Sequence, residues 1–441
     1  MVMGAGGIGL EDAVLIQVAK QPGETSIITV NCPDKTGLGC DICRTILEFG
    51  LCISRGDVST DGQWCYLVYW VIPCPNSISI QWTNLKNRLL SLCPTFAIPF
   101  YPELTRPTVP QFYLLKLFSA DRKGLLHDVT RVLSELELLI HRVKVSTTPD
   151  DRVVDLFFIT DGLEQLHTKK RQDETCKKIV DALSSSVSCE IMLAEEFRQG
   201  FSSLPSEVAE QLFKPELSES ELCFLSLSSD MKKLKKANVS FDNSLSPGHT
   251  LLQINCVDQK GLLYDILRTT KDCNIQITYG RFMTNMKGFR DIDLFIQQLD
   301  GKKVVDTEKQ EFLASRLKSE MLHPLRVMIV GRGPDTELLV ANPVELSGKG
   351  RPLVFYDVTL ALKMLGICIF SAEIGRQTAS ERQWEVYRFL LDESREFPLS
   401  NCKANRNQVV DRVRRSLMVA QVVRALDSLL RSSGFKSACL R

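Results

Sequence analysis

Two spacings of hydrophobic residues recur along the chain, one typical of strands and one typical of helices. Within residues 289–298 the aliphatic positions Ile292, Leu294 and Ile296 alternate with Asp291, Asp293 and Phe295, and this period of two predicts a strand with one buried face. Leu125, Val129 and Val132 follow one another in steps of four and three, which predicts an amphipathic helix. The chain therefore mixes strands and helices throughout.

These patterns follow one another in the order β-α-β-β-α-β, and the order is repeated. One copy has predicted strands at 112–118, 139–147, 152–160 and 188–196, and helices at 125–136 and 171–186. A later copy has strands at 250–256, 275–283, 289–298 and 325–331, with its second helix at 306–322. The order predicts an α+β fold of tandem ferredoxin-like βαββαβ units, each an antiparallel four-stranded sheet with helices on one face.

Four such repeats account for most of the chain. We expect an N-terminal extension at 1–21, repeats 1 to 4 at 22–102, 110–196, 248–332 and 335–431, and a flexible linker at 197–247. The linker is rich in Ser, Lys, Glu and Pro, with room for one short helix. Repeat 4 shows no clear closing strand, so we expect it to be incomplete or closed in another way. The linker divides the chain into two pairs of repeats.

Each repeat begins with the same strand–turn–helix segment, which we call a joint. Joints 1 to 4 lie at 32–42, 119–129, 256–266 and 349–357. The first three carry Asp-x-x-Gly before the helix, as in SADRKGLLHDV of joint 2. Joint 4 has a longer loop and lacks the first acid.

The chemistry of a joint suits a small zwitterion. The first N–H groups of a helix have no partner within it and favour an anion, while glycine allows a ligand close to the backbone. The aspartates are either local turn caps or acceptors for an ammonium group. The candidate ligand-binding residues are Asp34, Thr36, Gly37 and Leu38 in joint 1, Asp121, Lys123, Gly124 and Leu125 in joint 2, and Asp258, Lys260, Gly261 and Leu262 in joint 3.

Composition and charge narrow the classes of function that the chain can have. The 441 residues are too many for one core, and the net charge of +1 gives no global field for nucleic acid. We find no RNP-like aromatic pattern, no apolar run long enough to span a membrane and no secretory signal. We therefore expect the fifteen cysteines to be reduced and mostly buried. We predict no metal and no cofactor, and we expect His127 to pack as an aromatic residue, because Tyr264 and Tyr356 hold its position in other repeats.

Repeated D-x-x-G-L-L-x-D-[VI] turns in such units resemble ACT domains, the small-molecule regulatory modules of amino-acid metabolism. The chain is more similar still to the plant ACT domain repeat (ACR) family, whose members have four tandem ACT domains. GRPLVFYDVTLALKMLGICIFSAEIGRQ and RQWEVYRFLL resemble repeat 4 of one subgroup. Similar tandem units end the bacterial uridylyltransferase that senses glutamine. The resemblance implies binding of a free amino acid, with glutamine a candidate, at joints between paired units.

We predict a non-catalytic amino-acid sensor or regulatory protein that acts on an unidentified protein partner. The alternative is a protein-interaction scaffold with vestigial ligand sites, supported by the altered joint 4. Sheet edges or faces offer a route to a homo-oligomer, and no nucleic-acid partner and no transmembrane segment are expected. The predicted location is the cytoplasm, with the nucleus as a second compartment.

Overall fold

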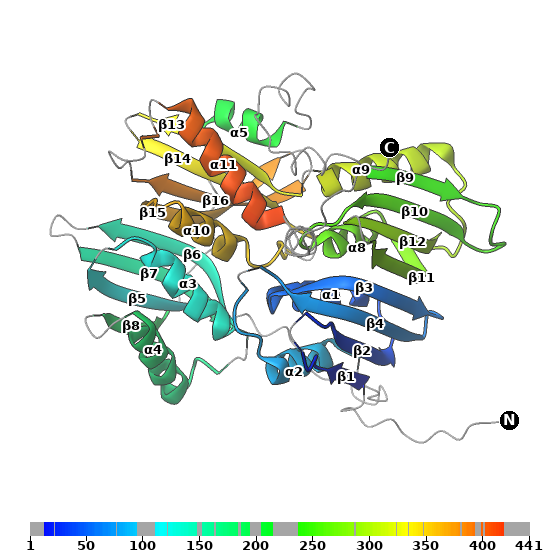
Figure 1. The fold of residues 1–441 in the computed structure, drawn as a ribbon, viewed down its shortest axis with the longest axis horizontal. Helices are drawn as coiled ribbons and strands as arrows, with labels where there is room; N and C mark the ends of the chain where they lie inside the picture. Colours follow the sequence, from blue (N-terminus) through cyan, green and yellow to red (C-terminus); the bar gives the residue numbers. More distant parts are fainter. Residues whose placement is uncertain are drawn as a thin grey trace, which may run out of the picture. The chain divides into compact units, whose positions relative to one another are not determined.

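The structure is a computed structural model, drawn in Figure 1. It describes residues 13–21, 23–75, 77–94, 111–120, 122–147, 152–162, 165–183, 187–194, 204–214, 237–285, 288–322, 324–333, 335–346, 348–379, 382–392, 398–399 and 402–418.

The chain forms two compact modules, each built from two repeats that are not neighbours in sequence. Module 1 takes its described residues from within 13–94 and 237–324, together with Met418. Module 2 takes them from within 111–214 and 325–417. Repeats 1 and 3 thus share a module, as do repeats 2 and 4. The expectation that the linker separates two self-contained pairs was wrong, because the pairing crosses it.

Module 1 is one antiparallel eight-stranded sheet. Its strand order is β1-β2-β4-β3-β11-β12-β10-β9. The strands are β1 Val14–Gln17, β2 Ser26–Pro33, β3 Leu51–Thr60, β4 Trp64–Pro73, β9 Ala237–Asp242, β10 Thr250–Val257, β11 Ile275–Thr284 and β12 Phe289–Gln298. The sheet is continuous because edge strand β3 of repeat 1 pairs with edge strand β11 of repeat 3.

Four helices and one face of this sheet share a single core. The helices are α1 Leu38–Glu48, α2 Trp82–Leu92, α8 Leu262–Asp272 and α9 Thr307–Leu322. The buried cluster joins alternate strand residues such as Ile28, Val30 and Leu294 to helix residues such as Ile42 and Ile266. Alternation along the strands thus places one sheet face under the helices, as the sequence predicts.

Module 2 holds two four-stranded antiparallel sheets. The sheet of repeat 2 has the order β6-β7-β5-β8, and that of repeat 4 has β13-β14-β16-β15. The strands are β5 Tyr113–Ala120, β6 Leu138–Thr147, β7 Arg152–Asp161, β8 Ser188–Leu193, β13 Arg326–Arg332, β14 Asp335–Pro343, β15 Ile369–Ala379 and β16 Arg382–Leu391. The helices are α3 Leu125–Glu135, α4 Lys169–Leu183, α5 Ser206–Phe213, α10 Val354–Met364 and α11 Lys403–Met418. The predicted α+β class with ferredoxin-like units is confirmed.

In three repeats the fourth strand of the sheet precedes the first long strand in sequence, although it was predicted to follow the second helix. In repeats 1, 3 and 4 the strands β1, β9 and β13 precede the first long strand and pair with it, whereas only β8 of repeat 2 follows its second helix. The place beside the first strand can be filled from either end of a repeat, and only two residues separate β13 from β14, as in a hairpin. The predicted closing strand of repeat 3 at 325–331 therefore belongs to repeat 4. Repeat 4 is thus closed by a strand at its beginning, and not by one at its end.

Two segments expected outside the repeats are therefore structural. Strand β1 lies within the predicted N-terminal extension 1–21, and β9 lies within the predicted linker 197–247. The one short helix expected in that linker is α5, whose Leu212 and Phe213 pack on Leu339 and Trp384 of repeat 4. Helix α5 thus covers a sheet face that would otherwise be exposed, and the linker is not uniformly flexible.

Buried aromatic and thiol groups complete the cores. His127 lies under Tyr356 with their ring centroids 4.9 Å apart, which confirms the predicted packing role. Cys52 and Cys74 form a disulfide, so the expectation that all cysteines are reduced was wrong for this pair. The register of β3 and β4 brings them within disulfide reach, with Cα atoms 5.3 Å apart. The other cysteines within the described stretches are free thiols.

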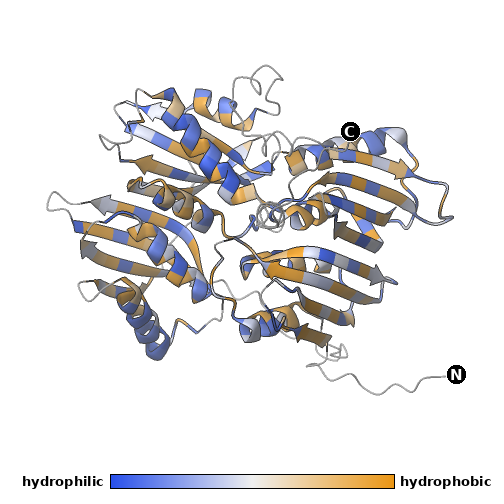
Figure 2. Ribbon diagram, in the orientation of Figure 1, coloured by the Kyte–Doolittle hydropathy of each residue, from blue (hydrophilic) through white to orange (hydrophobic). Residues whose placement is uncertain are grey.

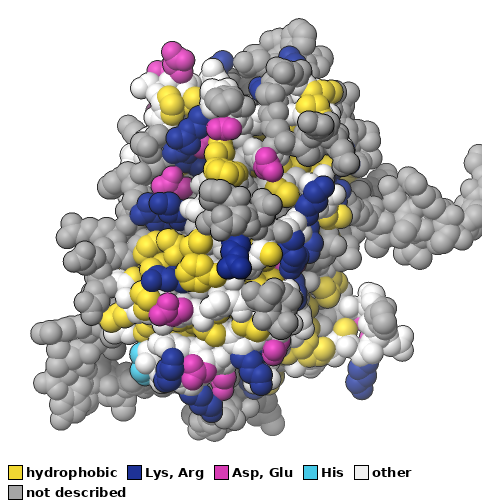
Figure 3. All heavy atoms as spheres, turned by 90° about the vertical axis from the view of Figure 1, so that its left-hand side faces the viewer, with side chains coloured by type: hydrophobic (Ala, Val, Ile, Leu, Met, Phe, Trp, Pro, Cys, Tyr) yellow, Lys and Arg dark blue, Asp and Glu magenta, His cyan; other side chains and the backbone are white. Residues whose placement is uncertain are grey.

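The surface matches the near-neutral composition. Figure 2 shows apolar and hydrophilic residues alternating along strands, and a largely hydrophilic exterior on helices α4 and α11. On the face drawn in Figure 3, basic, acidic and hydrophobic side chains are all present. No helix within the described stretches combines the length and apolar content needed to cross a bilayer.

Candidate functional site

Joint 1 connects the end of β2 to the start of α1. Gly37 stands immediately before the helix in the left-handed region, with φ of 83°, which explains the need for glycine there. Asp34 accepts a 2.6 Å hydrogen bond from the Thr60 hydroxyl, and its own N–H donates to the carbonyl of Gln63. Asp34 therefore ties the joint to the β3–β4 hairpin, and no side chain caps α1.

A cavity of about 960 Å³ opens at joint 1, between repeats 1 and 3 of module 1. Its size is at the upper end of the range of small-molecule sites. Repeat 1 contributes all four candidate residues of joint 1, and repeat 3 contributes Lys271 and the bulged segment at Ile277 and Thr278. Neither repeat encloses this space alone.

Charges of both signs line the cavity. Lys271 comes from the last turn of α8 and lies over Gly37, where an added Cβ would come within 2.8 Å of the lysine Cε. Its Nζ is 4.0 Å from an Asp41 carboxylate oxygen at the start of α1. Asp34 and Thr60 also line the cavity. The cavity thus offers an acid, a base and a helix N-terminus to one ligand.

The inner wall of the cavity includes thiol and phenol groups. Burial raises the pKa of Tyr69 well above its ordinary value. Cys65 lines the cavity, and its sulfur lies 3.7 Å from that of Cys32. Hydrogen bonding to Cys65, then to Cys93, raises the pKa of the Cys32 thiol, which stays protonated at neutral pH. The same hydrogen bond lowers the pKa of Cys65, which is the thiol of this pair that lines the cavity.

Joint 2 in module 2 shows a similar arrangement, although Asp121 lies outside the described residues. Gly124 has φ of 79°, and Lys363 of α10 covers it as Lys271 covers Gly37. Lys363 Nζ and Arg122 bind the Asp128 carboxylate at 2.6 and 2.7 Å. Burial opposes ionisation of Asp128, but these hydrogen bonds outweigh it and lower its pKa. The other two candidates differ in burial, since Lys123 is exposed and Leu125 is buried.

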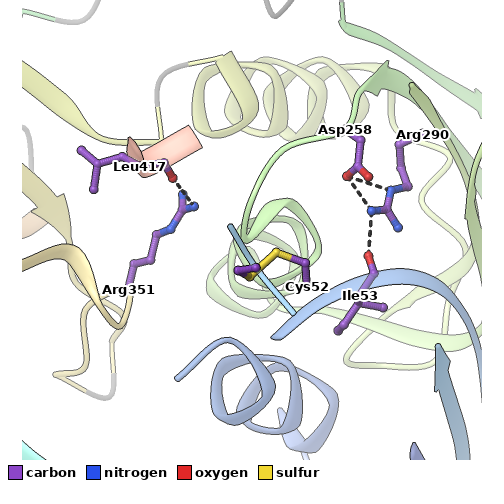
Figure 4. Close-up of a disulfide and its surroundings, with 7 residues drawn as sticks. Cys52, Ile53, Asp258, Arg290, Arg351 and Leu417 are labelled. Atoms are coloured by element: carbon purple, nitrogen blue, oxygen red, sulfur yellow. Dashed lines mark hydrogen bonds and ion pairs between the residues drawn. A yellow bond between two sulfur atoms is a disulfide. The ribbon is translucent and has the colours of Figure 1, made fainter. Parts of the chain in front are cut away.

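Joint 3 is closed by the protein itself. Arg290 binds Asp258 at 2.5 Å and donates to the Ile53 carbonyl of repeat 1 at 2.8 Å (Figure 4). It also donates to the Ser54 carbonyl of repeat 1 at 3.1 Å. The candidates Asp258, Lys260 and Leu262 are all buried, and the Lys260 N–H donates to the Met418 carbonyl. Gly261 has φ of 74°, so glycine is needed for the turn with or without a ligand. The remaining space is about 30 Å³, enough for about one water.

Joint 4 is also filled from within. Leu353 takes the left-handed position before α10, with φ of 62°, where the other joints have glycine. The buried Arg351 exchanges hydrogen bonds with Asn342 and donates to the Leu417 carbonyl at 3.0 Å. The longer loop and missing acid thus give a structurally different joint.

Sequence reasoning missed three residues that distinguish the joints: Cys65, Lys271 and Arg290. Each comes from an element other than the joint that it affects, so no motif within a joint reveals it. The sequence does place a lysine in the last turn of both α8 and α10, and this shared position could have indicated a common role for Lys271 and Lys363. No group of three or more metal-ligating side chains is present among the described residues.

The fold and site define a class of protein: paired ferredoxin-like repeats with a polar cavity at a strand–helix joint. Residues 105–194 and 238–335 match the family description "ACR9-like, ACT-like domain". Residues 16–94 match "ACT domain-containing protein ACR10, N-terminal", and residues 336–419 match "ACT domain-containing protein ACR9, C-terminal".

Two curated relatives are similar over nearly their whole length. ACT domain-containing protein ACR9 of Arabidopsis thaliana is 59% identical over 420 residues, covering 93% of this chain and 99% of the relative. ACT domain-containing protein ACR10 of the same plant is 50% identical over 406 residues, covering 90% and 97%. The chain therefore belongs to the plant ACT domain repeat (ACR) family, as its motifs indicated.

Proposed function

We propose that this chain is a non-catalytic regulatory protein that binds a free amino acid in the joint 1 cavity. The supporting observation is the cavity itself, which brings Asp34, Lys271 and the start of α1 to one space shared by two repeats. An amino acid carries an ammonium and a carboxylate that complement this arrangement. Glutamine is the candidate suggested by the resemblance to the glutamine-sensing uridylyltransferase.

Binding between two repeats gives a direct route to regulation. A ligand that bridges joint 1 and α8 favours the arrangement of repeats that fits it, and a partner protein that distinguishes arrangements responds. The partner is unidentified. A cytoplasmic location, with the nucleus as a second compartment, belongs to this proposal and rests on the sequence.

Isothermal titration of the full chain against the twenty amino acids tests the proposal. We expect at least one to bind, and we expect Lys271→Met to weaken that binding at least tenfold, because a carboxylate loses its cationic partner. Lys318→Met is the matched control, since Lys318 is an exposed lysine on α9 away from the cavity. Absence of binding by all twenty, with the chain folded, would rule the proposal out.

The alternative is a protein-interaction scaffold whose ligand sites are vestigial. It is favoured by joints 3 and 4, where internal arginines take the space near the turn. A scaffold would capture the same partners from plant extract with or without every amino acid. Capture that changes with one amino acid would favour the regulatory function.

A further inference from the structure

Repeats 1 and 3 correspond position by position, so the open joint 1 can be compared with the closed joint 3. Both have a left-handed glycine before the helix, and both have a threonine hydroxyl that donates to the aspartate. These hydrogen bonds are Thr60 to Asp34 at 2.6 Å and Thr284 to Asp258 at 2.9 Å. Both repeats also carry a β-bulge in the same strand, after Ile53 in repeat 1 and after Ile277 in repeat 3.

In joint 3 these shared features hold a guanidinium group. The Arg290 head is nine-tenths or more buried and donates to three acceptors: the Asp258 carboxylate and the carbonyls of Ile53 and Ser54. The two carbonyls come from the bulge of the other repeat, where the ladder is interrupted and Ser54 is left outside the regular pairing. Joint 3 is therefore a complete receptor for a cationic N–H group, and a side chain of the protein occupies it.

Joint 1 has the corresponding residues without the arginine. Arg290 pairs with Cys256 in the sheet, and the residue that pairs with the equivalent Cys32 is Cys65. A short thiol thus stands where joint 3 has a guanidinium. Asp34, Thr60 and the bulge residues Ile277 and Thr278 all line the cavity of about 960 Å³, against about 30 Å³ at joint 3.

A second difference concerns the opposite end of the ligand. Lys271 of α8 reaches joint 1, and the residue at the same helix position in α1 is Leu47, which lines the space at joint 3. Joint 3 thus combines an internal cation with an apolar wall, whereas joint 1 combines an empty cation receptor with a lysine. Of these two joints, only joint 1 is equipped for a molecule that carries a cationic and an anionic end.

We propose that the joint 1 cavity binds its ligand through a cationic N–H group that takes the place held by Arg290 in joint 3. Asp34 and the backbone carbonyls of Ile277 and Thr278 accept its hydrogen bonds, and Lys271 receives the carboxylate. Cys65 is the specificity-determining position, because a short side chain there keeps the receptor open. The inference rests on the proposed function and deepens it. Module 1 has one ligand site, and that site binds an unmodified ammonium group or a guanidinium group.

Titration of the full-length protein with blocked ligands and with variants tests this inference. We use each amino acid that binds the wild type, its N-acetyl derivative, and the guanidinium compounds arginine and N-acetylarginine. N-acetylation should abolish binding of an α-ammonium ligand, and Cys65→Arg should reduce binding at least a hundredfold by supplying an internal occupant. Tyr66→Arg is the matched control, because it places an arginine at the exposed neighbouring position of β4, outside the cavity lining, and it should bind as the wild type does.

Asp34→Asn provides a second test if Cys65→Arg does not fold. It is nearly isosteric but presents N–H donors to the cation, so binding should fall at least tenfold while thermal unfolding stays close to that of the wild type. Binding of amino acids but not of N-acetylarginine assigns the receptor to an ammonium group. Binding of N-acetylarginine, whose α-ammonium is blocked, assigns it to a guanidinium, and both outcomes agree with the inference. Binding that survives Cys65→Arg, Asp34→Asn and N-acetylation overturns it and leaves the proposed function intact. No binding of any compound by the folded wild type overturns both.

Discussion

His127 is a buried histidine whose protonation opposes the fold of module 2. Its ring packs on Tyr356, and its Nδ1 is 3.2 Å from the Thr359 hydroxyl. Burial first, and then the charge of Lys363, lower its pKa from 6.5 to about 4. The nearby Asp128 favours protonation and Arg131 opposes it, so the balance remains toward the neutral form.

The sign of the pH effect follows from this lowered pKa. Between about pH 6.5 and about 4 the unfolded chain binds a proton at this residue and the folded chain does not, so the free energy of unfolding falls as pH falls. Below about pH 4 both states are protonated and this effect levels off. Urea unfolding at intervals from pH 7 to 4 should show that His127→Phe removes this part of the pH dependence. An unchanged pH profile in the variant would contradict the assignment.

At the residue scale, the sequence predicted the joints well and their occupancy poorly. The Asp-x-x-Gly turn, the left-handed glycine and the helix start were all readable within one segment. Whether a joint is open depends on Cys65 or Arg290, which reach it through strand pairing, and on Lys271, which comes from another repeat. Local spacing carries no information on such contacts.

At the element scale, a glycine controls the pairing of β3 with β11. Phe282 of β11 packs directly over Gly56 of β3, where an added Cβ would lie 2.1 Å from its ring. Gly56→Ala should therefore lower the free energy of unfolding of module 1 by about 2–3 kcal/mol, since a buried ring must move in a packed core. Chemical denaturation of the full chain measures the change.

Gly39→Ala is the control for this substitution. Gly39 lies in α1, and an added Cβ would meet its nearest neighbour, Leu267, at an ordinary 3.9 Å. Alanine in a helix is about 0.5–1 kcal/mol more favourable than glycine, so this variant should be neutral or slightly stabilised. Equal destabilisation by both changes would show that the contact between Gly56 and Phe282 is not the cause.

Also at this scale, the sequence located nearly every strand and helix but not the partner of each edge strand. Hydrophobic period reveals that 326–332 is a strand, and it does not reveal which neighbour the strand pairs with. Strand β13 could be the last strand of repeat 3 or the first strand of repeat 4. Only two residues connect it to β14, so it pairs with β14 and belongs to repeat 4. Strands β1 and β9 were missed because they are only four and six residues long, too short to show a clear hydrophobic period.

At the scale of the whole molecule, repeats pair across the linker rather than with their sequence neighbours. Tandem repetition predicted that repeats would pack against one another, but four similar repeats offer several pairings with similar hydrophobic patterns. Specific side chains decide between them. Gly56 faces Phe282 between repeats 1 and 3, and His127 faces Tyr356 between repeats 2 and 4. Such complementarity is visible only once the surfaces are formed.

This pairing predicts how the chain behaves when it is divided. Residues 1–228 contain repeats 1 and 2, and residues 229–441 contain repeats 3 and 4, so each fragment holds half of both modules. Each fragment alone should expose the sheet edge β3 or β11 and the paired helix faces, and should aggregate or unfold without a cooperative transition. The two fragments expressed together should copurify through a tag on either one, and Gly56→Val in the first fragment should weaken that capture. A fragment 1–228 that unfolds cooperatively as a monomer would instead show that repeats 1 and 2 form a self-sufficient pair.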